Sequence, residues 1–75
     1  MINVIVGTST SRVNKLYQGG TSIRTILEDN AVDYSTAQIM LDGANLQPGD
    51  MDKTLSDFNI TEKCMLVAVV KAANA

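Results

Sequence analysis

The strongest constraint on the fold comes from an apolar run near the C-terminal end of the chain. Residues 65–70 are all apolar. Spanning a bilayer takes roughly 20 apolar residues, so this run predicts a strand of a sheet rather than a membrane helix. We expect the strand over residues 64–71. Its side chains would alternate between two faces, with Leu66, Ala68 and Val70 on one face and Val67 and Val69 on the other.

The length of the chain limits it to one small domain. Its 75 residues predict a single domain over residues 1–75. A chain of this size buries only about 60% of the surface that its unfolded form exposes, so we expect a thin core and no deep cleft between lobes. With 45% hydrophobic and 19% charged residues, the composition is typical of a globular chain rather than a disordered one.

Charge and residue usage exclude several classes of function. The net charge is -2, and the six basic and eight acidic residues are mixed along the chain, so we expect no nucleic-acid or membrane partner. The chain has no histidine, which removes the commonest general base and metal ligand. Its one cysteine, Cys64, cannot form an internal disulfide, which favours a cytoplasmic location. No signal peptide, cofactor or metal is expected.

The first part of the chain predicts a hairpin. In residues 2–6 the apolar side chains alternate with a period of two, which indicates a strand that has Ile5 on its outer face. The small polar residues 7–11 are typical of a turn. Residues 12–17 follow as a second strand, but their alternation is poor, so the register of this strand stays open.

The next segment predicts a short helix. Gly19 and Gly20 break the chain as a backbone turn, and Thr21 or Ser22 then caps a helix over residues 22–30. Three apolar side chains share one buried stripe with helical spacing: Ile23, Ile26 and Leu27. We expect Ala31 and Val32 to continue this buried edge.

The remainder predicts short strands and turns. Residues 38–41 indicate a strand, with Met40 on the opposite face from Ile39 and Leu41. A tight turn at residues 42–43, a turn or loop at 47–50 and a short turn or one-turn helix near 54–57 follow. The order of hairpin, helix and strands predicts an α+β fold.

Two segments carry a resemblance to a known family. Residues 54–60, Thr-Leu-Ser-Asp-Phe-Asn-Ile, resemble the closing section of ubiquitin, and residues 41–46, Leu-Asp-Gly-Ala-Asn-Leu, resemble its middle section. The similarity is closest over residues 39–70. The glycine pair before the helix is more similar to the bacterial sulfur carriers of thiamine and molybdopterin synthesis. The resemblance implies a ubiquitin-like β-grasp fold over residues 1–75, which is a mixed sheet with one helix packed across one face.

One departure from that family concerns the end of the sequence. Ubiquitin and its carrier relatives end in Gly-Gly, whose carboxylate is activated by an adenylating enzyme, whereas this sequence has Asn74 and Ala75 there. Side chains at these positions would clash where glycines thread into an activating site. This departure from the family therefore predicts a protein that is not conjugated to other proteins.

The outer face of the sheet is the predicted binding surface. If Ile39 and Leu41 point into the core, Met40 points outward, and the same parity argument applies to the other strands. The predicted protein-binding residues are Ile5, Met40, Val67, Val69 and Lys71. The resemblance to ubiquitin implies the same surface, with a thinner basic rim because Gln38 replaces one arginine. Two alternatives stay open: β-branched residues that only favour strands, or a patch covered by a second copy or a longer segment.

Other candidate sites are discounted. Nothing near Cys64 lowers its pKa, so we expect no reactive thiolate. Asp50, Asp52 and Asp57 lack the spacing of a calcium loop and predict a solvated loop. No acid–base or nucleophile–base pair stands out, so no enzyme activity and no catalytic residue are expected.

We therefore predict a non-conjugating protein–protein interaction module whose partners are other proteins. One alternative is a sulfur carrier or modifier that an adenylating enzyme activates at the C-terminal tail, Asn74 and Ala75. A third possibility is a purely structural component of a larger assembly.

Overall fold

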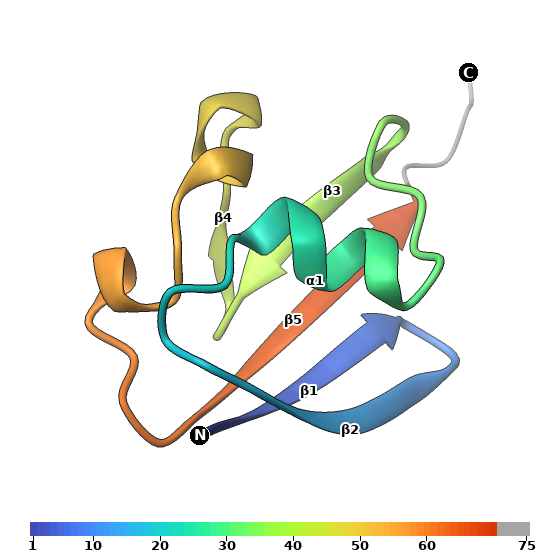
Figure 1. The fold of residues 1–75 in the computed structure, drawn as a ribbon. Coiled ribbons are helices and arrows are strands. Elements are labelled where there is room, and N and C mark those ends of the chain that lie inside the picture. The colour runs from blue at the N-terminus through green and yellow to red at the C-terminus, as the bar shows by residue number, and fades with distance from the viewer. Residues whose placement is uncertain (71–75) are drawn as a thin grey trace.

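A computed structural model describes residues 1–70, with Val70 described only by its backbone. The protein is an α+β domain, a five-stranded mixed sheet with one helix lying across one of its faces (Figure 1). The strands are β1 (Ile2–Thr8), β2 (Arg12–Tyr17), β3 (Ala37–Leu41), β4 (Ala44–Asn45) and β5 (Lys63–Val70). The helix is α1 (Ile23–Asp29), and two 3-10 helices follow β4, η1 (Pro48–Asp52) and η2 (Ser56–Phe58).

The strand from the apolar run lies in the middle of the sheet. The strand order is β2-β1-β5-β3-β4, and β5 pairs parallel with β1 and antiparallel with β3. The predicted hairpin is confirmed, with β2 over the predicted residues 12–17. β1 extends two residues beyond its predicted end at Val6, and β5 begins at Lys63, one residue early.

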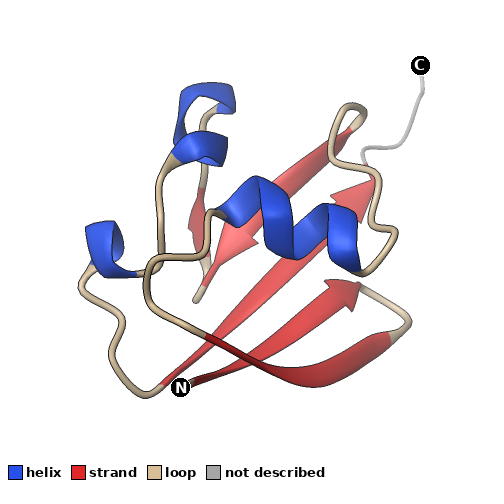
Figure 2. Ribbon diagram, in the orientation of Figure 1, coloured by secondary structure: helices blue, strands red, loops and turns tan. Residues whose placement is uncertain are grey.

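The core lies between α1 and the covered face of the sheet, which is the nearer face in Figure 2. The three predicted helix residues are fully buried, and the inward residues of β1, β3 and β5 pack with them. Buried residues outside the helix and strands complete the cluster: Val32, Leu46, Met51 and Leu55. The predicted division into a core face and an outer face is confirmed for the described side chains of β1, β3 and β5.

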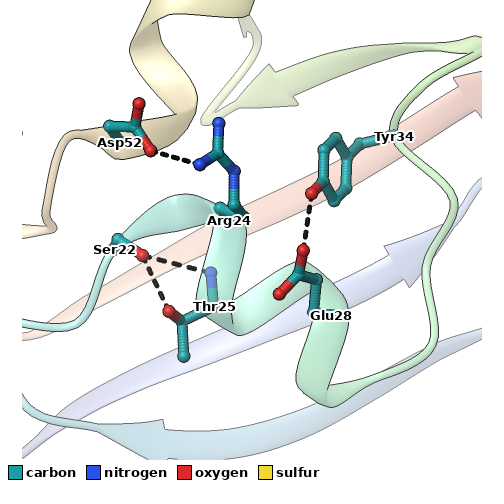
Figure 3. Close-up of polar contacts among 6 residues, drawn as sticks. All are labelled: Ser22, Arg24, Thr25, Glu28, Tyr34 and Asp52. Atoms are coloured by element: carbon teal, nitrogen blue, oxygen red, sulfur yellow. Dashed lines mark hydrogen bonds and ion pairs between the residues drawn. The ribbon is translucent and has the colours of Figure 1, made fainter.

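Both ends of α1 are capped. The Ser22 Oγ accepts a hydrogen bond from the Thr25 backbone N–H at 3.1 Å, as predicted for one of the two candidate caps (Figure 3). At the other end, the Val32 N–H donates to the Leu27 carbonyl at 2.9 Å, and the Ala31 N–H donates to the Glu28 carbonyl at 3.1 Å. These two bonds form a Schellman motif, which satisfies two carbonyl groups at the end of the helix.

The motif corrects one prediction. Val32 is buried, as expected, but Ala31 is exposed and has φ of 55°. The reversal of the chain at a Schellman motif requires a left-handed residue at this position, and that conformation turns Ala31 away from the core.

Polar contacts tie α1 to its neighbours (Figure 3). Arg24 forms an ion pair with Asp52 of η1 at 2.6 Å. The Tyr34 hydroxyl, in the loop that follows α1, donates a hydrogen bond to Glu28 at 2.6 Å. These side chains are partly or largely exposed, so we expect the contacts to set the position of α1 more than to stabilise the domain.

A long-range pairing joins the start of α1 to the segment before η2. The Ile23 N–H donates to the Lys53 carbonyl at 2.9 Å, and the Ser56 N–H donates to the Gly19 carbonyl at 2.9 Å. A Cβ atom on Gly19 would lie 2.5 Å from Ser56 Oγ, so a larger residue at this position would require the Ser56 hydroxyl to move. Leu55 is buried beneath the pairing. The segment therefore fixes the helix in place over the sheet.

Two features between β3 and η1 were only partly predicted. The tight turn at Asp42 (φ 51°) and Gly43 (φ 89°) is confirmed, because both residues are left-handed as a type I′ hairpin requires. The short strand β4 that it creates was not predicted. Residues 47–50 were predicted to be a turn or loop, and the structure forms the longer 3-10 helix η1 there. This helix begins at Pro48, and the Asp50 carboxylate caps it by accepting a hydrogen bond from the Gln47 N–H. No helix within residues 1–70 is long and apolar enough to cross a membrane.

We predict that Leu55→Ala lowers the free energy of unfolding by about 2–5 kcal/mol, because it removes a fully buried side chain and leaves a cavity. Urea denaturation followed by circular dichroism measures the effect. Leu16→Ala is the matched control: Leu16 is 60% exposed, so the same truncation should cost less than about 0.5 kcal/mol. Equal losses in the two variants would contradict the assigned role of Leu55.

Candidate interaction surface

The face of the sheet opposite α1 carries a row of apolar side chains. The strand register places Ile5 on β1 beside Met65 on β5, and Met40 on β3 beside Val67 on β5. Val69 follows Val67 on the same face of β5. We call these five residues the outer-face patch. In the ribbon view of Figure 2, α1 lies over the other face.

The members of the patch differ in exposure. Met65 is 37% exposed, while Ile5, Met40 and Val69 are half-buried. The expectation that Val67 is open to solvent is wrong, since it is only 6% exposed although it points outward. It lies on the central strand and lines one hollow together with the larger side chains of Arg12, Met40 and Met65. Val67 therefore forms the floor of the patch, and Met65 is its most exposed side chain.

The patch contains two shallow hollows that meet at Met65. One has a volume of about 220 Å³. Its lining residues come from β2, β3, β5 and two turns: Ser9, Arg12, Met40, Gly43, Met65, Val67 and Val69. The other has a volume of about 380 Å³ and is lined by Asn3, Ile5, Asp42, Lys63, Cys64 and Met65. Methionine side chains adapt to different partner shapes because they are unbranched and polarizable.

The position of Met65 is fixed by contacts from two directions. The Asp42 carboxylate accepts a hydrogen bond from the Met65 backbone N–H at 2.8 Å. On the other side, Arg12 Nη1 lies 3.7 Å from the Met65 sulfur, while Arg12 Nε donates to the Thr8 carbonyl at 3.1 Å. A guanidinium group therefore borders the apolar patch.

Charge is divided unevenly over the molecule. Seven of the eight acidic side chains, all except Glu62, already accept a hydrogen bond or form an ion pair within the described residues. In the same part of the chain, three cations have no carboxylate partner within 4.0 Å: Arg12, Lys15 and Lys63. Arg12 and Lys63 lie on the outer face. The unpaired positive charge is thus concentrated on β2 and at the border of the patch.

Part of this surface was predicted from the sequence. Met40, Val67, Val69 and Ile5 lie on one face, as predicted. Met65 was missed, although the parity of β5 was sufficient to assign it to the same face. Arg12, Leu16 and Lys63 were also missed. The first two could not have been placed, because their faces depend on a hairpin register that the poor alternation of β2 left open.

Three predicted site residues cannot be compared with the structure. Lys71, Asn74 and Ala75 lie outside the described residues. The predicted rim at Lys71 and the proposed activation of the tail therefore stay predictions. Gln38 is described, and it lies beside Val69 on the outer face.

Asn3 carries an unsatisfied polar atom. Its Oδ1 is buried and has no hydrogen-bond partner among the described residues. The register puts Asn3 on the outer face, between Leu16 and Lys63. A buried acceptor without a partner costs about 1–3 kcal/mol. The outer face of the sheet therefore includes one position that is poorly adapted to the folded domain alone.

We predict that Asn3→Val raises the free energy of unfolding by about 1 kcal/mol, because it removes this acceptor and introduces a residue that favours strands. Asn14→Val is the control, since Asn14 lies on the same face of the sheet but is exposed. Chemical denaturation of the two variants measures the difference. A gain of the same size at Asn14 would assign the whole effect to strand propensity.

Cys64 has the chemistry of a core residue. It is buried in the hydrophobic cluster, and burial, with a smaller contribution from the Asp42 carboxylate, raises the pKa of its thiol to about 11. A thiol in this environment is protonated at neutral pH, and only the thiolate is a good nucleophile. The expectation that Cys64 is not reactive is supported on physical grounds.

We predict that Cys64 reacts with iodoacetamide at about pH 8 at least about 100-fold more slowly in the folded protein than in denaturant, because unfolding restores an ordinary thiol pKa. Mass spectrometry of timed samples measures both rates. Comparable rates would show that the thiol is accessible and ionised in the folded domain.

Of the acidic residues discounted as a calcium site, Asp50 and Asp57 cap turns and Asp52 pairs with Arg24. Asp57 accepts a hydrogen bond from the Thr54 N–H at 2.9 Å, and the bond from the Gln47 N–H lowers the pKa of Asp50. Within residues 1–70, no three His, Cys, Asp or Glu side chains gather as metal ligands would. These carboxylates have clear local roles in the fold.

Comparison with protein-family models and with curated proteins identifies no relative of this chain. No protein-family model matches the sequence, and no curated protein is significantly similar to it. A functional proposal for this domain therefore depends on its own surface.

Proposed function

We propose that this protein is a non-enzymatic, ubiquitin-like β-grasp domain that binds other proteins through its outer-face patch. The architecture, a five-stranded mixed sheet with one helix across one face, is compatible with a β-grasp fold. The resemblance of residues 41–46 and 54–60 to ubiquitin supports the same assignment. The observation that carries the functional proposal is the patch itself, a group of apolar side chains on the face of the sheet that α1 does not cover.

The chemistry of the patch indicates the kind of partner that fits it. Its apolar floor at Val67 and its two methionines would pack against aliphatic or aromatic side chains. Arg12 and Lys63, which have no carboxylate partner within the described residues, border the patch from opposite ends. We therefore propose a partner surface with an apolar centre and carboxylates at its rim, because complementary charge guides association and fixes its orientation.

The alternative role, a carrier activated at its C-terminal end, makes a different prediction. It depends on Asn74 and Ala75, which lie outside the described residues, so the described surface gives it no support. A carrier would form a covalent acyl-adenylate with an activating enzyme and ATP. The interaction module would form complexes that denaturation separates.

We predict that Met40→Asp/Val69→Asp weakens partner binding at least about tenfold, because it places two charges in the apolar centre of the patch. Partners are first captured from a lysate of the source cells with the wild-type protein. The purified partner is then titrated with each variant by isothermal calorimetry. Arg12→Glu should also weaken binding, and its effect should decrease at high salt.

The matched control is Gln18→Asp/Thr61→Asp, which adds the same charge at exposed positions outside the patch. This variant should bind like the wild type, and circular dichroism should show that both double variants are folded. Full binding by the Met40→Asp/Val69→Asp variant would refute the proposed surface. Captured proteins that stay covalently attached in denaturant would instead support the alternative role, a carrier activated at its C-terminal end.

A further inference from the structure

One edge of the sheet is open. β2 is the first strand in the sheet order, and its only strand partner is β1 (Figure 1). Residues 12–16 of β2 are all exposed. A long, open edge strand is a template for pairing with another chain. The opposite edge is formed by β4, which has only two residues and offers much less backbone.

The direction of the free backbone groups follows from two hydrogen bonds. The Thr8 N–H donates to the Ser11 carbonyl at 2.8 Å across the hairpin, whereas the Asn3 N–H points the other way and donates to the Glu62 carbonyl beside β5 at 2.8 Å. Bonded and non-bonded pairs alternate along an antiparallel ladder. The residues of β2 whose N–H and C=O groups face away from β1 are therefore Arg12, Asn14 and Leu16.

We propose that β2 is a second binding site, at which an extended acidic segment of a partner protein adds a sixth strand to the sheet. The only charged residues of β2 are the cations Arg12 and Lys15, and neither has a carboxylate partner within the described residues. Opposite charges on neighbouring strands stabilise their pairing. A second copy of the domain fits less well, because two β2 strands would bring four cations together with no acid.

The side chains of β2 specify the composition of the added strand. Arg12 and Leu16 lie on the outer face, and Val13 and Lys15 lie on the face that carries α1. An antiparallel segment opposite residues 16 to 12 would read, from its N-terminus, apolar, acidic, polar, apolar, acidic. A labelled peptide Ser-Val-Glu-Thr-Val-Asp-Ser has this pattern and serves as the probe. The same peptide with lysine in place of Glu and Asp tests the charge.

The decisive variant removes one backbone donor from the open edge. In Asn14→Pro the lost N–H points away from β1, so the hairpin keeps its own hydrogen bonds. In fluorescence anisotropy titrations, we expect Asn14→Pro to bind the acidic peptide at least about tenfold more weakly than Asn14→Ala, which keeps the donor. Thermal melts of both variants show that they are folded.

A charge exchange tests the recognition independently of the backbone. The Arg12→Glu/Lys15→Glu variant should lose the acidic peptide and bind the lysine peptide, because it inverts the charge of the strand. Met40→Ala/Val69→Ala should bind the acidic peptide like the wild type, since those residues do not lie on β2 and the truncations add no charge beside Arg12. These variants therefore test binding at the outer-face patch and binding at β2 separately.

Three results would overturn the proposal. The first is no binding of the acidic peptide to the wild type at about 1 mM. The second is equal binding by Asn14→Pro and Asn14→Ala. The third is a dimer in sedimentation experiments that Asn14→Pro dissociates, because a second copy would then be the natural occupant of the edge.

Discussion

The structure depends on the pairing of β5 with strands on both of its sides. β5 lies between β1 and β3, so its backbone hydrogen bonds hold together the hairpin at one end of the sheet and the short strands at the other. Its two rows of apolar side chains have different roles. Leu66 and Ala68 face α1 and join the core, while Val67 and Val69 face outward. One strand therefore determines both the stability of the domain and the surface that it presents.

The small size of the helical layer explains why an apolar outer face remains. α1 has only seven residues, and its three buried side chains cover one face of the sheet. The described chain provides no second helix for the other face. The acidic side chains are largely occupied by caps and ion pairs, which leaves unpaired cations on β2 and at the patch. Apolar area and positive charge thus occur together on the uncovered side of a molecule with a net negative charge.

Periodicity predicted most of the fold, and its failures have specific physical causes. The strands other than β4, the cap at Ser22 and the faces of β5 follow from local spacing. The exposure of Ala31 and the burial of Val67 did not follow, because the first depends on how the helix ends and the second on the size of neighbouring side chains across the sheet. The cationic border was missed for a similar reason: the position of Arg12 is set by hairpin register, which a weak alternation does not determine.

The parallel pairing of β1 with β5 also affects how the chain folds during synthesis. β1 leaves the ribosome about sixty positions before residues 63–70, with which it pairs in parallel. Until those residues emerge, β1 can form only the hairpin with β2, and its inward apolar side chains have no core to enter. Folding on the ribosome is therefore delayed until β5 has emerged. During that interval the hairpin is the part of the nascent chain that most needs protection from aggregation.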